Sequence, residues 1–147
     1  MDLFGRSFLD GSNDTDVYLW NMRIGHTTIS TDKELTKGHG RHLEKAIEAL
    51  NQAGARCSLA GTASKDGSLQ ANTRVCNQRV ADLLVFLAQK SNALITQFQI
   101  KDPIIQPATN NDNPGLWRGV RIRITSDGFF KSVSTRDPTA PEALDMT

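Results

Sequence analysis

Hydrophobic residues recur with a helical period in two separate segments of the chain. They are Leu43, Ile47 and Leu50 in the first segment and Cys76, Val80, Leu83 and Leu87 in the second. Spacings of three and four residues place such side chains on one face of a helix. We therefore expect two amphipathic helices, one from about residue 39 to a glycine stop at Gly54, the other from Asn72 to about residue 91.

Four further segments, at residues 17–24, 56–60, 94–100 and 120–124, are typical of strands. In the last, three hydrophobic residues alternate with Arg121 and Arg123, which we expect on the solvent side of an edge or near-edge strand. The order of the elements predicts an α+β fold, a βαβαββ sandwich whose mixed sheet carries two main helices on one face. Residues 1–16 are expected to form a flexible N-terminal arm, and residues 126–147 a disordered C-terminal extension.

Composition and charge narrow the functional classes. The 147 residues are enough for one domain with a modest core. The net charge of +1 creates no overall field that would attract nucleic acid, so we expect no nucleic-acid partner. No apolar run approaches the roughly 18 residues of a membrane span. The N-terminus lacks a secretory signal pattern, so the chain is intracellular, or it is a fragment or mature form of something larger.

Residues 61–79 (GTASKDGSLQANTRVCNQR) connect the second expected strand to the second helix. Loops between two rigid elements often carry binding groups, and a helix start offers unpaired N–H groups to anions. We therefore expect any site here, and the candidate side chains follow from the resemblance described next.

The sequence resembles the OmpA-like (OmpA/MotB C-terminal) domain family, whose members bind peptidoglycan without catalysis. The family's second strand ends in G-H-T-D-x-x-G, followed by an Asn and then by L-S-x-x-R-A. Here Gly61, Gly67, Asn72 and Arg79 match at the right spacing, and Val75-Cys76 stands for L-S. The family's closing strand begins N-R-R-V-E-I, which the segment from Trp117 to Ile122 matches at its first Arg, its Val and its Ile. The resemblance covers about residues 17–125 and implies an OmpA-like domain there.

The resemblance also implies a ligand, the zwitterionic diaminopimelate side chain of the cell-wall peptide. The family's loop aspartate takes the ammonium, and its helix arginine takes the carboxylate. Arg79 keeps the arginine, but Ser64 stands where the aspartate would be, and Gly119 replaces the family's second closing-strand arginine. Asp66, two residues beyond Ser64, could substitute if the loop reshapes.

These residues leave alternatives open. The ligand-binding candidates are Ser64, Asp66, Asn72, Arg79 and Arg118. Arg79 either clamps a carboxylate or bonds loop carbonyls between Gly61 and Gly67, Asn72 either caps the second helix or contacts ligand, and Arg118 is either an accessory contact or a solvated arginine. Cys57 and Cys76 are either two buried thiols or a disulfide.

No catalytic motif is present, so we expect a non-enzyme without a cofactor. His39 and His42 share a helix but lack the further ligands of a metal site, so we expect no metal.

Two functions remain. The first is anchoring of a cell-envelope protein to peptidoglycan in the periplasm of a Gram-negative bacterium. The second is an assembly module, with a protein partner in a secretion or phage-tail-like complex, that has kept the scaffold without the ligand; a cytoplasmic location then stays open.

Overall fold

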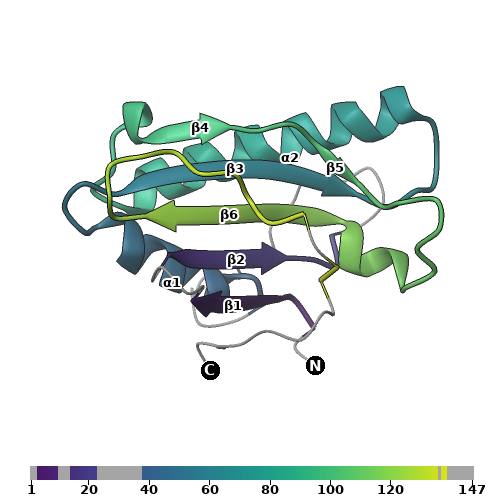
Figure 1. The fold of residues 1–147 in the computed structure, drawn as a ribbon, viewed down its shortest axis with the longest axis horizontal. Coiled ribbons are helices and arrows are strands. Elements are labelled where there is room, and N and C mark those ends of the chain that lie inside the picture. Colours follow the sequence, from purple (N-terminus) through teal and green to yellow (C-terminus); the bar gives the residue numbers. More distant parts are fainter. Residues whose placement is uncertain (1–2, 10–13, 23–37, 136, 139–147) are drawn as a thin grey trace.

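The computed structural model describes residues 3–9, 14–22, 38–135, 137 and 138. They form one mixed sheet with two α-helices packed on one of its faces (Figure 1). The α+β architecture expected from the hydrophobic pattern is therefore confirmed.

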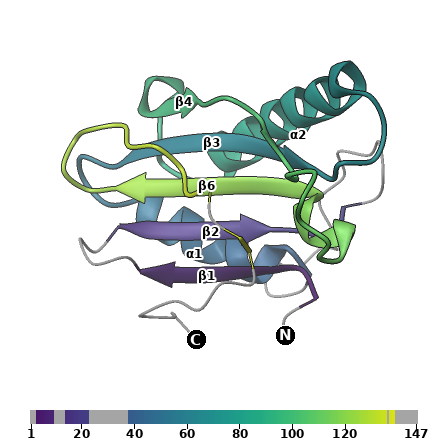
Figure 2. The same ribbon diagram turned by 45° about the vertical axis from the view of Figure 1, so that its right-hand side comes forward.

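The sheet has six strands, and its middle strands are β6 and β3. The strands are β1 (Gly5–Leu9), β2 (Thr15–Leu19), β3 (Arg56–Ala63), β4 (Phe98–Ile100), β5 (Ile104–Ile105) and β6 (Gly119–Thr125). Their spatial order is β1-β2-β6-β3-β4, with β5 also paired to β3 (Figure 2). β6 runs antiparallel to both β2 and β3, whereas β4 and β5 run parallel to β3.

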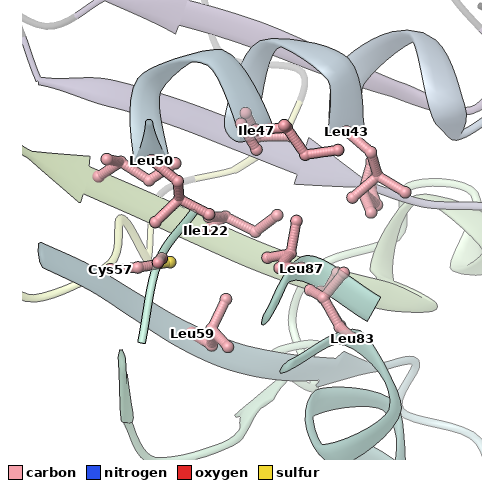
Figure 3. Packing of buried hydrophobic residues seen from close by; sticks show 14 of the residues in the cluster. Leu43, Ile47, Leu50, Cys57, Leu59, Leu83, Leu87 and Ile122 are labelled. Carbon is pink, nitrogen blue, oxygen red and sulfur yellow. The ribbon is translucent and has the colours of Figure 1, made fainter. Parts of the chain in front are cut away.

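The main core lies between this sheet and the helices α1 (Gly40–Leu50) and α2 (Leu69–Lys90). The hydrophobic stripe of α1 packs onto alternate residues of the central strands, together with the stripe of α2 (Figure 3). The residues labelled there are Leu43, Ile47, Leu50, Cys57, Leu59, Leu83, Leu87 and Ile122. Both helical stripes were expected from their spacing, and both are confirmed.

Three of the expected strands have clearly different bounds. The strand expected at residues 94–100 is shortened to β4, because Ile95–Gln97 form a 3-10 helix. The strand expected at residues 17–24 ends at Leu19, because Asn21 takes a left-handed backbone conformation with φ 60°; residues 23–37 lie outside the described residues. β3 continues through Gly61 and Thr62 to Ala63, so Gly61 belongs to the strand and not to the loop.

The expectation of a flexible N-terminal arm is wrong for residues 5–9. They form β1, which pairs antiparallel with β2 from Gly5↔Leu19 to Leu9↔Thr15. Phe8 is fully buried, and its ring meets the Tyr18 ring edge-on with 5.1 Å between centroids. A buried aromatic side chain of this kind holds the N-terminal segment on the domain.

The expectation that Arg121 and Arg123 face solvent from an edge strand is wrong as well. β6 is central, and Arg121 is only 2% exposed. Its guanidinium carbon lies 4.5 Å from the Tyr18 ring centroid and 5.2 Å from that of Trp117. Arg123 donates to Asp14 at 2.8 Å and lies 3.5 Å from Asp16. The alternation of hydrophobic and polar residues in β6 was predicted correctly, but the polar face of the strand is covered.

The cover is the chain that follows β6, which we call the strap: residues 126–135 with 137 and 138. Figure 1 shows this yellow segment crossing β3 and β6 on the face turned away from the helices. Lys131 Nζ donates to Asp14 at 3.0 Å, and Arg121 Nη1 donates to the Ser134 carbonyl at 2.7 Å. The expected disorder is therefore wrong for these residues, because buried arginine and aspartate side chains bind them; residues 139–147 lie outside the described residues.

Both cysteines are free and buried. Cys76 lies beside Gly61, whereas Cys57 is four residues earlier on β3, about 13 Å away at the usual rise of a strand. That separation exceeds what a disulfide can span. Burial raises the pKa of the Cys76 thiol to about 11, although the charge of Arg79 partly opposes this shift. Because this pKa is high, the thiol stays protonated at neutral pH.

Gly61 allows α2 to lie directly on β3, which yields a stability prediction. A Cβ at Gly61 would lie 2.2 Å from the Cys76 carbonyl oxygen, so the helix would have to move. We expect Gly61→Ala to lower the free energy of unfolding by about 3 kcal/mol, the upper end for overpacking. Gly128→Ala is the control, since a Cβ there meets nothing within 4 Å. Only the positive φ of 85° disfavours alanine at this position, and it should lower the free energy of unfolding by about 1 kcal/mol. Urea denaturation measures both; an equal loss in the two variants would contradict the account.

Candidate functional site

The loop between β3 and α2 brings three of the predicted site residues together. β3 ends at Ala63, and residues 64–68 turn into α2, whose N-cap is Ser68. The Ser68 hydroxyl accepts a hydrogen bond from the Ala71 N–H at 3.1 Å. Gly67 supplies the left-handed conformation of the turn, with φ 86°. The turn therefore leaves Ser64 and Asp66 ahead of the helix start.

Arg118 connects this loop to the closing strand. Its Nε donates to Ser64 Oγ at 3.2 Å, and its Nη2 donates to Asp66 Oδ2 at 3.1 Å. The Arg118 side chain is 17% exposed and that of Asp66 is 58% exposed, whereas Ser64 is buried. Within the described residues, no hydrogen bond reaches Arg118 Nη1 or Asp66 Oδ1. Each partner of the ion pair thus keeps one polar atom for a further contact.

The position of Arg118 follows from a backbone contact of the next residue. Gly119 N donates to Thr62 Oγ1 at 3.0 Å, which joins the start of β6 to the end of β3. A Cβ at Gly119 would lie 1.8 Å from the Leu19 carbonyl oxygen. The family's second arginine is therefore absent for a steric reason, because β2 passes too close for any side chain there.

Arg79 lies behind this pair and is turned toward the backbone. It is 1% exposed, and its Nη1 donates to the Thr62 carbonyl at 2.7 Å. Burial lowers the pKa of Arg79, nearby Cys76 opposes that shift, and the positive charge of Arg118 lowers it further. The contact with a carbonyl at the strand end is the structural role foreseen for this arginine, and its burial separates it from the exposed ion pair.

Of the two roles considered for Asn72, capping of α2 is wrong, because Ser68 occupies the N-cap one turn earlier. Its side chain is half-buried, and its Oδ1 would lie 3.4 Å from a Cβ on Gly67. Asn72 therefore supports the inner side of the turn.

A second loop, which the sequence marks only as long and polar, holds the site loop in place. The Lys65 N–H donates to Gln106 Oε1 at 3.2 Å, and Gln106 N donates to the Ala63 carbonyl at 2.9 Å. Lys65 Nζ donates to the carbonyls of Ala108 and Asn110, at 3.1 and 2.6 Å. Gln106 is 3% exposed, and its burial in an otherwise polar loop was not visible from the sequence.

The chain is similar to known proteins in its three-dimensional structure. No family model matches the sequence, and no curated protein matches it. The fold is similar to the cell wall anchor of the T6SS from Pseudomonas aeruginosa, with 12% identity, a TM-score of 0.55, and 83% of this chain and 89% of that chain covered. This chain has the fold of OmpA-like domains.

Two other structures support the same assignment. A periplasmic domain of Helicobacter pylori MotB has 12% identity and a TM-score of 0.58, covering 82% of each chain. The OmpA-like domain of FopA1 from Francisella tularensis has 12% identity and a TM-score of 0.55, covering 83% of this chain and 80% of that one. The OmpA-like fold inferred from two separated motifs is thus confirmed, while the identities are too low to carry a ligand across.

Two negative findings apply to the described residues. None of their helices combines the length and the hydrophobicity needed to cross a membrane. Among them, no three His, Cys, Asp or Glu side chains gather in a way that could hold a metal ion. The two described histidines are engaged elsewhere, since His39 Nε2 bonds the Trp20 carbonyl and His42 Nδ1 bonds the Ser7 hydroxyl.

The different burial of the two arginines predicts different costs on removal. Arg79→Ala leaves a cavity and an unsatisfied Thr62 carbonyl, so we expect it to lower the free energy of unfolding by about 3 kcal/mol. Arg118→Ala breaks a partly exposed pair and is expected to cost about 1 kcal/mol or less. Urea denaturation of both variants tests this, and a larger loss for Arg118→Ala would contradict the structural role assigned to Arg79.

Proposed function

We propose that this chain is a non-catalytic OmpA-like module that binds the diaminopimelate-containing stem peptide of peptidoglycan and so anchors a cell-envelope protein in the periplasm. The observation that carries the proposal is the Arg118–Asp66 pair. It holds a cation and an anion 3.1 Å apart at the junction of β3, α2 and β6.

The pair suits a ligand with an ammonium and a carboxylate on one carbon. Ser64 and Asp66 occupy Nε and Nη2 of Arg118, which leaves Nη1 beside Nη2 for a ligand carboxylate. Arginine binds carboxylates most strongly through two adjacent N–H groups. Asp66 Oδ1 is the matching acceptor for the ligand ammonium. Asp66 thereby supplies the charge that Ser64 lacks, without a large movement of the loop.

The ion pair also costs little to rearrange. An exposed pair of this type contributes about 1 kcal/mol or less, so a ligand that contacts both partners competes with a weak interaction. Ser64 and the loop anchored through Lys65 keep Arg118 and Asp66 oriented before the ligand arrives, which reduces the entropic cost of binding.

Relatives of this fold are consistent with such a role. The similar structures include a cell wall anchor and periplasmic domains. The proposed ligand, the periplasmic location and the residues of the site go beyond that likeness and rest on the chemistry of the pair.

An assembly module without peptidoglycan binding is the second candidate. The burial of Arg79 favours it, because the arginine expected to clamp a carboxylate is bonded to the chain's own backbone. The same scaffold would then hold a protein partner in a larger complex.

Co-sedimentation with purified Gram-negative sacculi tests the proposal. We expect the wild type to sediment, and Arg118→Gln and Asp66→Asn each to weaken binding about tenfold or more, since each removes one charge-assisted contact. Lys90→Gln and Asp82→Asn change the same charges on exposed positions of α2 and are expected to bind like the wild type.

Two outcomes would decide against the peptidoglycan proposal. A wild type that stays in the supernatant would favour the assembly module. Equal losses in the control variants would mean that binding depends on net charge and not on the pair.

Ser64→Asp adds a carboxylate at the family's position, so we expect it to strengthen binding of diaminopimelate if the pair marks the ligand site.

A further inference from the structure

The sheet face opposite the helices recognises the strap through main-chain carbonyls. Arg121 Nη1 donates to the Ser134 carbonyl at 2.7 Å, and Arg6 Nη1 donates to the Pro138 carbonyl at 3.4 Å. Thr125 Oγ1 donates to the Phe129 carbonyl at 2.5 Å. Because every residue carries a carbonyl, these hydrogen bonds suit an extended backbone of many sequences and are not specific to the strap.

This face also carries buried polar groups that no described residue satisfies. The Tyr18 hydroxyl, the Trp117 indole N–H and the Ser58 hydroxyl are buried without a hydrogen-bond partner in the described part of the chain. The three residues are 2%, 2% and 1% exposed. Buried polar groups are nearly always paired, and an indole N–H can only donate. The face therefore has donors that the described residues leave unused.

Two of these groups belong to rings that flank one guanidinium. The rings of Tyr18 and Trp117 flank Arg121, with centroids 4.5 and 5.2 Å from its guanidinium carbon. Ser58 lies on the neighbouring strand opposite Arg123, in the row next to Arg121. Donors grouped around a cation favour an acceptor that carries negative charge, such as a side-chain carboxylate.

We propose that the sheet face beneath the strap is a binding surface for an extended, acidic peptide segment of a partner protein, and that the strap is its built-in competitor. The partner's backbone carbonyls take the place of those of the strap, and its carboxylate accepts from Trp117, Tyr18 and Arg121. This surface is separate from the Arg118–Asp66 pair and does not depend on peptidoglycan binding.

The strap is held at its edges by interactions that are weak enough to exchange. Lys131, with a side chain 35% exposed, bonds Asp14, the residue before β2. Asp137 accepts from Asn110 Nδ2 at 3.1 Å. The Lys131 end of its pair is screened by solvent, and the buried Asp14 keeps Arg123 as a partner at 2.8 Å when Lys131 leaves. A partner that satisfies the buried donors can therefore displace the strap.

Two synthetic peptides test the proposal on the full chain. The first has the sequence of residues 126–138, SDGFFKSVSTRDP, and the second carries Val133→Glu, because Val133 is a buried strap residue next to Ser134, whose carbonyl accepts from Arg121. Trp20→Phe leaves Trp117 as the single tryptophan, so its fluorescence reports binding at the buried donors. Anisotropy of labelled peptides on the unsubstituted chain gives the same affinities without that substitution.

We expect the Val133→Glu peptide to bind more tightly than the strap peptide. We also expect Lys131→Ala with Asp137→Ala to raise the affinity for both peptides about tenfold, because two weak interactions no longer hold the strap on the sheet. Lys90→Ala with Asp102→Ala makes the same charge changes at exposed positions away from the strap and should leave both affinities unchanged.

Three results would overturn the proposal. The first is no binding of either peptide to the strap-weakened variant at millimolar concentration. The second is an acidic peptide that binds no more tightly than the strap peptide. The third is an affinity that rises equally in the Lys90 and Asp102 control.

Discussion

Both arginines of the site depend on Thr62, where β3 ends beside β6. Its carbonyl accepts from Arg79, and its hydroxyl accepts from the Gly119 N–H, directly opposite in the strand register. Pairing shifted by one residue would turn every β6 side chain to the other face and remove Arg118 from the loop. The antiparallel pairing of β3 with β6 is therefore the constraint from which the geometry of the site follows.

That pairing places the two arginines in different environments. Arg79 is buried, and it stabilises the strand end on which the loop is built. Arg118 reaches the surface, where it meets Ser64 and Asp66. A serine at the family's aspartate position thus orients a guanidinium, and the negative charge stands two residues further along the loop. The candidate site therefore holds one cation and one anion, Arg118 and Asp66.

The sequence contained enough to predict the architecture and part of the site. Core packing was predicted correctly, because it leaves a periodic signal in the sequence. The signals are the two helical stripes, the alternation of β6 and the spacing from Gly61 to Arg79. The burial of Arg121 and the partial burial of Arg123 could not be predicted from the same alternation, because the cover comes from the strap, whose polar composition is typical of disorder. Long-range polar interactions, such as those of Lys65 and Gln106 with the neighbouring loop, leave no periodic signal.

Our proposal that Arg118, and not Arg79, contacts the ligand carboxylate is tested most directly by the NMR signals of their side-chain Nε–H groups during titration with diaminopimelate. We expect the Arg118 signal to shift with ligand concentration while the Arg79 signal stays in place, and we expect Asp66→Asn to weaken the response. A shift of the Arg79 signal with Arg118 unaffected would contradict the proposal, and would return the carboxylate contact to the helix arginine of the OmpA-like pattern.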